Sequence, residues 1–132
     1  MSDDTLPPIR TAITDMLGCD YPIIAAPMFL VSNEAIVIEA SNAGAVGAAP
    51  SLNWRPSSSF EESLLKVKAA TNRPYAINLI VSKSNPRLEE DLAIVVKHKV
   101  PVVITSLGNP ADVVRAVHNY GGKVFCDVTT LD

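Results

Sequence analysis

The sequence has little that would suit it to a structural metal, a nucleic acid or a membrane. Its two cysteines, Cys19 and Cys126, are too far apart to form a metal-ligand pair or a redox dithiol, so we expect two reduced thiols. Lysine and arginine number 11 against 14 acidic residues, and no basic run is interleaved with aromatic residues, which argues against a nucleic-acid partner. No apolar run approaches the roughly 18 residues of a membrane span, which argues against a membrane partner.

Nucleotide-binding loops and targeting signals are also missing. There is no Gly-x-Gly-x-x-Gly after an expected strand and no phosphate-binding loop ending in Gly-Lys-Ser/Thr, so a dinucleotide or P-loop fold is not expected. The chain starts with Met-Ser-Asp-Asp, which lacks the basic and apolar regions of a signal peptide. With 132 residues and 48% hydrophobic content it can bury a core, and we expect a cytoplasmic protein.

Apolar segments alternate along the chain with segments of helical periodicity. The apolar segments are continuous, which is typical of strands in a parallel sheet that is covered on both faces. The expected strands span residues 23–26, 45–49, 75–80, 101–105 and 123–128. The expected helices lie at about 33–43, 59–67, 88–96 and 110–118, the first capped by Ser32 or Asn33 and the second opened by a capping box of Ser59 and Glu62. A short helix over 10–17 is expected to cover the bottom of the sheet.

This alternation predicts a parallel α/β fold. Its units recur at a period close to the roughly 30 residues of a β-α-β unit, whereas a complete (β/α)8 barrel needs about 250 residues. We therefore predict that residues 1–132 form half of a TIM-type (β/α)8 barrel, with about five strands and four helices. An autonomous doubly wound parallel sheet fits the same length and is the alternative.

A motif surrounds the first expected strand. The residues Tyr21-Pro-Ile-Ile-Ala-Ala-Pro-Met28, preceded by Arg10-Thr11 and Leu17-Gly18, resemble the opening of the nitronate monooxygenase family, formerly called 2-nitropropane dioxygenases. The resemblance covers nearly all 132 residues and implies that residues 1–132 are the truncated, N-terminal half of a single FMN-binding TIM-type (β/α)8 barrel. It also implies a small-molecule substrate, through the oxidation of alkyl nitronates with dioxygen. Relatives of the family include flavin-dependent enoyl-acyl-carrier-protein reductases and quinone reductases, so hydride transfer from NAD(P)H through FMN is the alternative activity.

The resemblance places candidate cofactor-binding residues at the ends of the first and third strands. It implies that the backbone of Ala26, Pro27 and Met28 packs against the isoalloxazine ring, although a methionine there could equally fill the core. Asn78 is a polar amide inside an apolar strand, so from chemistry alone it must either satisfy a backbone group or meet a ligand. In the family an asparagine at this strand end lies beside the flavin ring, which favours the second reading.

Strands four and five end in further polar side chains. Thr105 and Ser106 end the fourth strand, where a hydroxyl can contact flavin or substrate, although serine and threonine before a helix are also ordinary turn residues. Asp127 lies near the end of the fifth strand and could orient a ligand, although relatives often carry uncharged residues at this point. We include all three as candidate cofactor-binding residues.

The remaining titratable residues are expected to be structural. His98 and His118 lie at the ends of expected helices. A helix that follows a strand runs back toward the amino ends of the strands, whereas barrel enzymes have their active site at the carboxyl ends, so neither histidine is a candidate base. The carboxylates in the first turns of the expected helices should be solvated; they are Glu61, Glu62, Glu89, Glu90 and Asp91.

The family's other functional motifs are absent from this sequence. It has neither the glycine-rich loops that hold the FMN phosphate nor the Gly-Gly-His motif whose histidine serves nitronate oxidation, so the catalytic residues are unknown. A third reading is therefore a non-catalytic half-barrel that pairs with another chain, as a homo-oligomer or with a missing C-terminal half. In that reading the exposed edge strands would be the contact surfaces.

Overall fold

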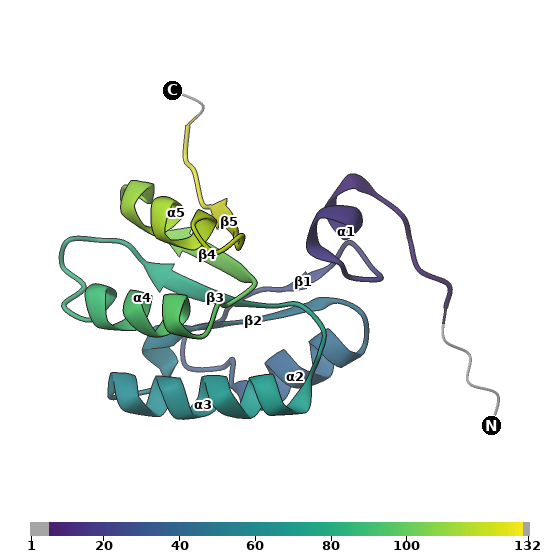
Figure 1. The fold of residues 1–132 in the computed structure, drawn as a ribbon, viewed down its shortest axis with the longest axis horizontal. Helices are drawn as coiled ribbons and strands as arrows, with labels where there is room; N and C mark the ends of the chain where they lie inside the picture. The colour runs from purple at the N-terminus through teal and green to yellow at the C-terminus, as the bar shows by residue number, and fades with distance from the viewer. Residues whose placement is uncertain (1–5, 131–132) are drawn as a thin grey trace.

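A computed structural model describes residues 6–130, which form one parallel sheet with helices packed mainly on one face (Figure 1). The five strands are β1 (Ile24–Ala25), β2 (Val46–Pro50), β3 (Tyr75–Ile80), β4 (Val102–Ser106) and β5 (Lys123–Cys126). The helices are α1 (Ala12–Leu17), α2 (Glu34–Asn42), α3 (Ser57–Ala70), α4 (Leu88–Lys97) and α5 (Ala111–His118), with a 3-10 turn η1 at Ser51–Asn53.

The strands lie in the order β1-β2-β3-β4-β5, and every neighbouring pair is parallel. Helices α2 to α5 all contribute to the core on one side of the sheet. A doubly wound sheet would instead reverse its strand order and carry helices on both faces. The prediction of half a (β/α)8 barrel is therefore confirmed, and the doubly wound alternative is wrong.

The outer, helix-facing side holds the larger core. On β3 it takes Tyr75, Ile77 and Leu79, which alternate with inward-facing residues because successive side chains of a strand point to opposite faces. The helices cover these strand residues with buried apolar side chains: Val37, Phe60, Leu64, Val67, Ile94, Val95, Val113 and Val117. This packing fixes the direction in which each inward side chain points.

The inner side holds a smaller cluster, which α1 covers at the amino ends of the strands. Leu17 and Cys19 pack there on the inward residues of three strands, which are Val46, Ala48, Ala76, Val102 and Ile104. This confirms that the short helix covers the bottom of the sheet. Pairing in register places Pro50, Asn78, Ile104 and Phe125 in one row across this face.

Two local predictions need correction. Asn33 does cap α2, because its Oδ1 accepts the Ile36 N–H at 3.1 Å, but α3 begins at Ser57 directly after Pro56 and has no side-chain cap. The expected capping box at Ser59 is wrong because Pro56, with its fixed φ, ends the extended segment earlier. Asp91 is fully buried and not solvated, since two serine hydroxyls and Arg87 supply it with hydrogen bonds.

Candidate active site at the carboxyl ends of the strands

Asn78 lies on the inner face of β3 and is 5% exposed. Its Nδ2 donates to the carbonyl oxygen of Ile104 at 3.0 Å and to Ser106 Oγ at 2.9 Å. Its Oδ1 accepts no hydrogen bond from any residue between 6 and 130. An amide oxygen without a protein donor is available to a ligand that carries an N–H or O–H group.

Ser106 extends this arrangement to the next strand. It accepts from Asn78 and donates to Asp127 Oδ2 at 2.6 Å, a distance typical of a hydroxyl bonded to a carboxylate. Register explains why the three side chains meet: Ser106 and Asp127 follow inward residues of β4 and β5 by two positions. We call Asn78, Ser106 and Asp127 the polar chain.

Thr105 does not join the polar chain. It lies one residue from Ser106 on β4, so its side chain points to the helix-facing side, where it is 2% exposed. There its Oγ1 donates to the carbonyl oxygen of Phe125 at 3.4 Å. Its own carbonyl already accepts the Asp127 N–H at 3.0 Å, so Thr105 is held within the sheet.

Ala26, Pro27 and Met28 lie in the loop between β1 and α2, at the same end of the sheet. The Met28 side chain is 43% exposed, and its backbone groups are bonded within the protein. Its N–H donates to Ser32 Oγ at 2.9 Å, and its carbonyl accepts from Asn53 Nδ2 at 3.0 Å. Met28 therefore offers a ligand its thioether side chain and not a free backbone donor.

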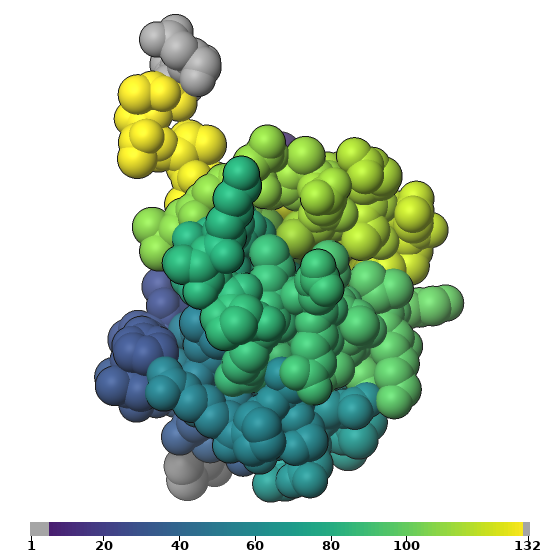
Figure 2. Space-filling view, turned by 90° about the vertical axis from the view of Figure 1, so that its left-hand side faces the viewer, coloured from purple at the N-terminus to yellow at the C-terminus, as the bar shows by residue number. Residues whose placement is uncertain are grey.

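A hollow of about 370 Å³ lies beside the polar chain. Ser106 and Asp127 line it together with Leu107, Gly108 and Val128. Figure 2 looks onto this end of the molecule, where the loops that follow β1 to β4 and the segment after β5 come to the surface. Ser106 and Asp127 therefore face open space at the carboxyl ends of the strands, which we call the rim.

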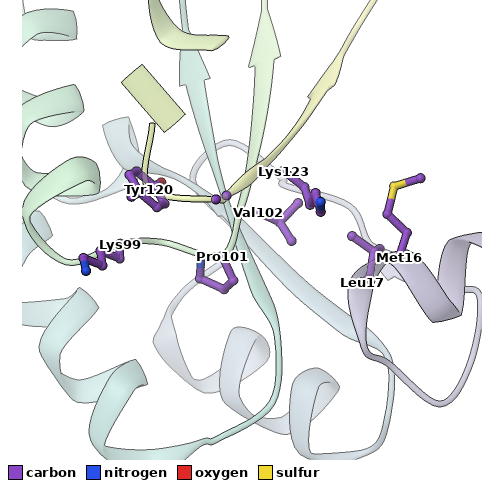
Figure 3. A pocket seen from close by; sticks show the side chains of 9 residues that line it. Met16, Leu17, Lys99, Pro101, Val102, Tyr120 and Lys123 are labelled. Carbon is purple, nitrogen blue, oxygen red and sulfur yellow. The ribbon is translucent and has the colours of Figure 1, made fainter. Parts of the chain in front are cut away.

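Another hollow, of about 230 Å³, lies at the opposite end of the sheet (Figure 3). Met16 and Leu17 of α1 line one side of it, and Tyr120 and Lys123 lie across from them. It borders the amino ends of β4 and β5 and contains no residue of the polar chain. In parallel α/β folds ligands bind at the carboxyl ends of the strands, so we place the functional site at the rim.

The histidines are remote from the rim, as expected. His98 follows the last residue of α4 and its Nε2 lies 2.6 Å from Glu61 Oε1, while His118 ends α5. Hydrogen bonds from Lys97 and His98 hold the pKa of Glu61 below its usual range. Within residues 6–130 no three His, Cys, Asp or Glu side chains gather as metal ligands, and Cys19 and Cys126 are free thiols.

Asn53 and Asp91 are site-supporting residues that sequence reasoning missed. Asn53 bonds to the loop that carries Met28, and Asp91 bonds to the turn that carries Asn53. Both interactions join residues at least 25 positions apart in the chain, so no local pattern marks them. The sequence offers one sign that Asp91 is buried, because Asp91 shares an otherwise apolar face of its helix with Ile94 and Val95.

The fold and the site together define a class of protein. The chain is part of a parallel α/β barrel, and its polar groups gather at the carboxyl ends of the strands, as they do in barrel enzymes. A family model described as nitronate monooxygenase matches residues 10–91, which is more than half of the chain. The chain belongs to the nitronate monooxygenase family.

Individual relatives agree with this assignment. The chain is 28% identical over 86 residues to a (3aS,4S,5R,7aS)-5-hydroxy-7a-methyl-1-oxo-octahydro-1H-indene-4-carboxyl-CoA dehydrogenase of Rhodococcus jostii (strain RHA1), covering 65% of this chain and 24% of that protein. It is 33% identical over 73 residues to a probable nitronate monooxygenase of Staphylococcus saprophyticus, covering 55% of this chain and 20% of that protein. The structure of FabK from Thermotoga maritima superposes with a TM-score of 0.84 at 26% identity, covering 92% of this chain and 38% of that one.

The chain thus spans a quarter or less of the curated relatives that it matches, and 38% of the FabK chain. The superposition on FabK covers 92% of this chain, and it agrees with the five-stranded parallel sheet being half of a barrel. Among the described residues no helix is long and apolar enough to cross a membrane.

Proposed function

We propose that this chain is the N-terminal part of a single FMN-binding (β/α)8 barrel and forms one wall of the flavin site. The whole protein would be a flavin-dependent oxidoreductase that oxidises alkyl nitronates with dioxygen. The observation that carries the proposal is the polar chain at the strand ends, in which Asn78 Oδ1 has no donor among residues 6–130. Membership of the nitronate monooxygenase family supports the chemical class.

The rim residues fit an isoalloxazine ring. The ring is a flat aromatic system with N–H and carbonyl groups on one edge, so it needs an apolar surface beside a hydrogen-bonding side chain. Met28 supplies exposed thioether surface and Asn78 supplies an acceptor that lies on the inner face. The sequence has no glycine-rich phosphate loop, so the FMN phosphate would be held by residues outside this chain.

In this arrangement the polar chain orients the ligand. A bound FMN would supply the redox chemistry that links the substrate carbon to dioxygen. Asp127 accepts from the Ser106 hydroxyl, and Ser106 accepts from the Asn78 amide nitrogen, so that Oδ1 is left free for a ligand. Neither His98 nor His118 lies at the rim, and we assign no proton-transfer residue to this chain.

A second candidate function is oxidoreduction of an acyl thioester or quinone with NAD(P)H as the electron donor. It is favoured by the 28% identity to a relative whose name describes a carboxyl-CoA dehydrogenase. The wall of the flavin site would be the same, and only the substrate would differ. Oxygen consumption with an alkyl nitronate, compared with NAD(P)H consumption with an enoyl thioester, separates the two on a flavin-loaded protein.

A third candidate is a non-catalytic half-barrel that pairs with a second copy or with the remaining half of the barrel. Its supporting observation is that β1 and β5 each pair with one neighbour only among the described residues. Light scattering tests the self-pairing form. A monodisperse dimer would support it, and a monodisperse monomer would contradict it.

A titration that compares FMN with riboflavin tests the flavin wall. If this chain contacts the ring but not the phosphate, both flavins should quench saturably on binding, with dissociation constants that agree within about threefold, or roughly 0.6 kcal/mol. A strong preference for FMN would contradict the placement of the phosphate site outside this chain. Absence of binding by either flavin would contradict the proposal that this half forms the wall by itself.

A further inference from the structure

The loop between β1 and α2 presents four successive apolar side chains to solvent. Met28 is 43% exposed, Phe29 55%, Leu30 74% and Val31 57%. Exposed apolar side chains that lie together commonly mark a binding surface. Leu30 also has φ 63°, in the left-handed region where the Cβ of any residue other than glycine is crowded. Something must therefore hold this loop in a conformation that it would not adopt alone.

Asn53 makes the contacts that hold it. Its Oδ1 accepts the Leu30 N–H at 2.9 Å, and its Nδ2 donates to the carbonyl oxygens of Met28 at 3.0 Å and Ser32 at 2.8 Å. One side-chain amide thus uses three of its four hydrogen-bonding positions on a single turn. Inside the turn the Ser32 N–H donates to the Met28 carbonyl at 2.9 Å, so Met28–Ser32 is a closed unit clamped from outside.

Asn53 is itself supported by a group of buried, hydrogen-bonded residues. Asn53 ends η1, and η1 begins with Ser51, whose hydroxyl donates to Asp91 Oδ2 at 2.7 Å. Both Ser51 and Asp91 are fully buried, and Arg87 bonds Asp91 Oδ1 at 2.9 Å. The loop after β1 is therefore tied through η1 to the start of α4, and in Figure 2 the dark blue segment lies beside the blue segment that follows β2.

We propose that Asn53 is a positioning residue that holds the turn Met28–Ser32 in the shape in which Met28 faces the ligand. This inference rests on the proposed function, since it takes the ligand to be the flavin ring. Asn53 acts through Met28 and does not touch the ring itself. Ser32 Oγ, which accepts the Met28 N–H at 2.9 Å, closes the turn from within.

Backbone hydrogen exchange tests the clamp without any ligand. In Asn53→Ala the Ser32 N–H keeps its own acceptor, the Met28 carbonyl, so faster exchange at Ser32 would report opening of the whole turn. We expect at least about tenfold faster exchange there, with core amides of β3 unchanged as the internal check on folding. Asn53→Asp, which keeps an acceptor for Leu30 and loses both donors, should accelerate Ser32 as well.

Asn42→Ala is the matched control, because it removes an amide that donates to the Ala70 carbonyl far from the rim. It should leave exchange at Ser32 unchanged. Equal Ser32 exchange in wild type and Asn53→Ala would overturn the proposal. So would equal acceleration in Asn42→Ala, which would indicate general loosening.

Flavin affinity provides the functional readout. Asn53→Ala should raise the dissociation constant for FMN by about tenfold and shift the absorbance spectrum of the bound flavin, while Asn42→Ala should do neither. If wild type and Asn53→Ala bind FMN equally well, the positioning role is refuted while the flavin wall stands. If wild type does not bind FMN, the proposal that this half forms the flavin wall by itself fails, and the exchange data still decide whether Asn53 holds the turn.

Discussion

Replacement of Asp91 by alanine should cost this chain a large part of its stability. The Asp91 carboxylate is fully buried and accepts from Ser51 at 2.7 Å, from Ser57 at 2.8 Å and from Arg87 at 2.9 Å. Arg87 itself is only 18% exposed, so the variant leaves a nearly buried cation without its counter-ion and two hydroxyls without an acceptor. Breaking a buried pair on one side costs about 3 to 5 kcal/mol, against about 5 to 15 kcal/mol for a whole domain.

Urea unfolding measures this cost, with Asp112→Ala as the matched control. Asp112 forms an ion pair with Arg115 in which both side chains are well exposed, at 89% and 73%, so its loss should change the free energy of unfolding by less than about 0.5 kcal/mol. The double variant Arg87→Ala with Asp91→Ala should recover part of the loss, because no unpaired charge remains. A loss below about 1 kcal/mol in Asp91→Ala would refute the reasoning.

Two further predictions concern stability. Burial raises the pKa of Tyr75 from 10.0 to about 12, so the folded chain keeps this proton where the unfolded chain has lost it. The stability that Tyr75 contributes through this proton is present in full below pH 10 and is lost as the pH rises to about 12. The urea midpoint of wild type should therefore fall over this range, and Tyr75→Phe should remove the part of the fall that is due to Tyr75. An equal fall in wild type and Tyr75→Phe would contradict this prediction. Lys99 has φ 51° directly after the C-cap of α4, where glycine is favoured, so Lys99→Gly should raise the free energy of unfolding by about 0.5 to 1 kcal/mol. A destabilised Lys99→Gly in the same urea assay would show that its side chain contributes more than the backbone strain costs.

Much of the architecture was predictable because it is written in local patterns. Continuous apolar runs such as 75–80 identify strands of a covered parallel sheet, and their regular spacing identifies the repeated strand-helix unit. Asn78 was identifiable for the same reason, since one amide within an apolar strand needs a partner. Its partner Ser106 was expected at the correct strand end, and the side chains of both do meet.

Other parts of the site depend on contacts that no local pattern reveals. Thr105 and Ser106 are adjacent and chemically alike, and only the side-chain direction of β4 shows that Thr105 faces the helices. Asn53 and Asp91 act on residues far away in the chain, so their roles require the folded arrangement of η1 and α4. Sequence reasoning placed Asp91 in solvent because acidic residues in a first helical turn commonly are solvated.

The most direct test of the flavin wall is an absorbance titration of FMN with wild type, Asn78→Ala and Asn119→Ala. Asn119 follows α5 with an exposed side chain, so its replacement controls for the loss of an amide away from the rim. We predict saturable binding by wild type and Asn119→Ala, with a dissociation constant about tenfold higher in Asn78→Ala, equivalent to roughly 1.4 kcal/mol. Equal affinity in all three proteins, with folded spectra for each, would contradict the claim that Asn78 meets the flavin ring.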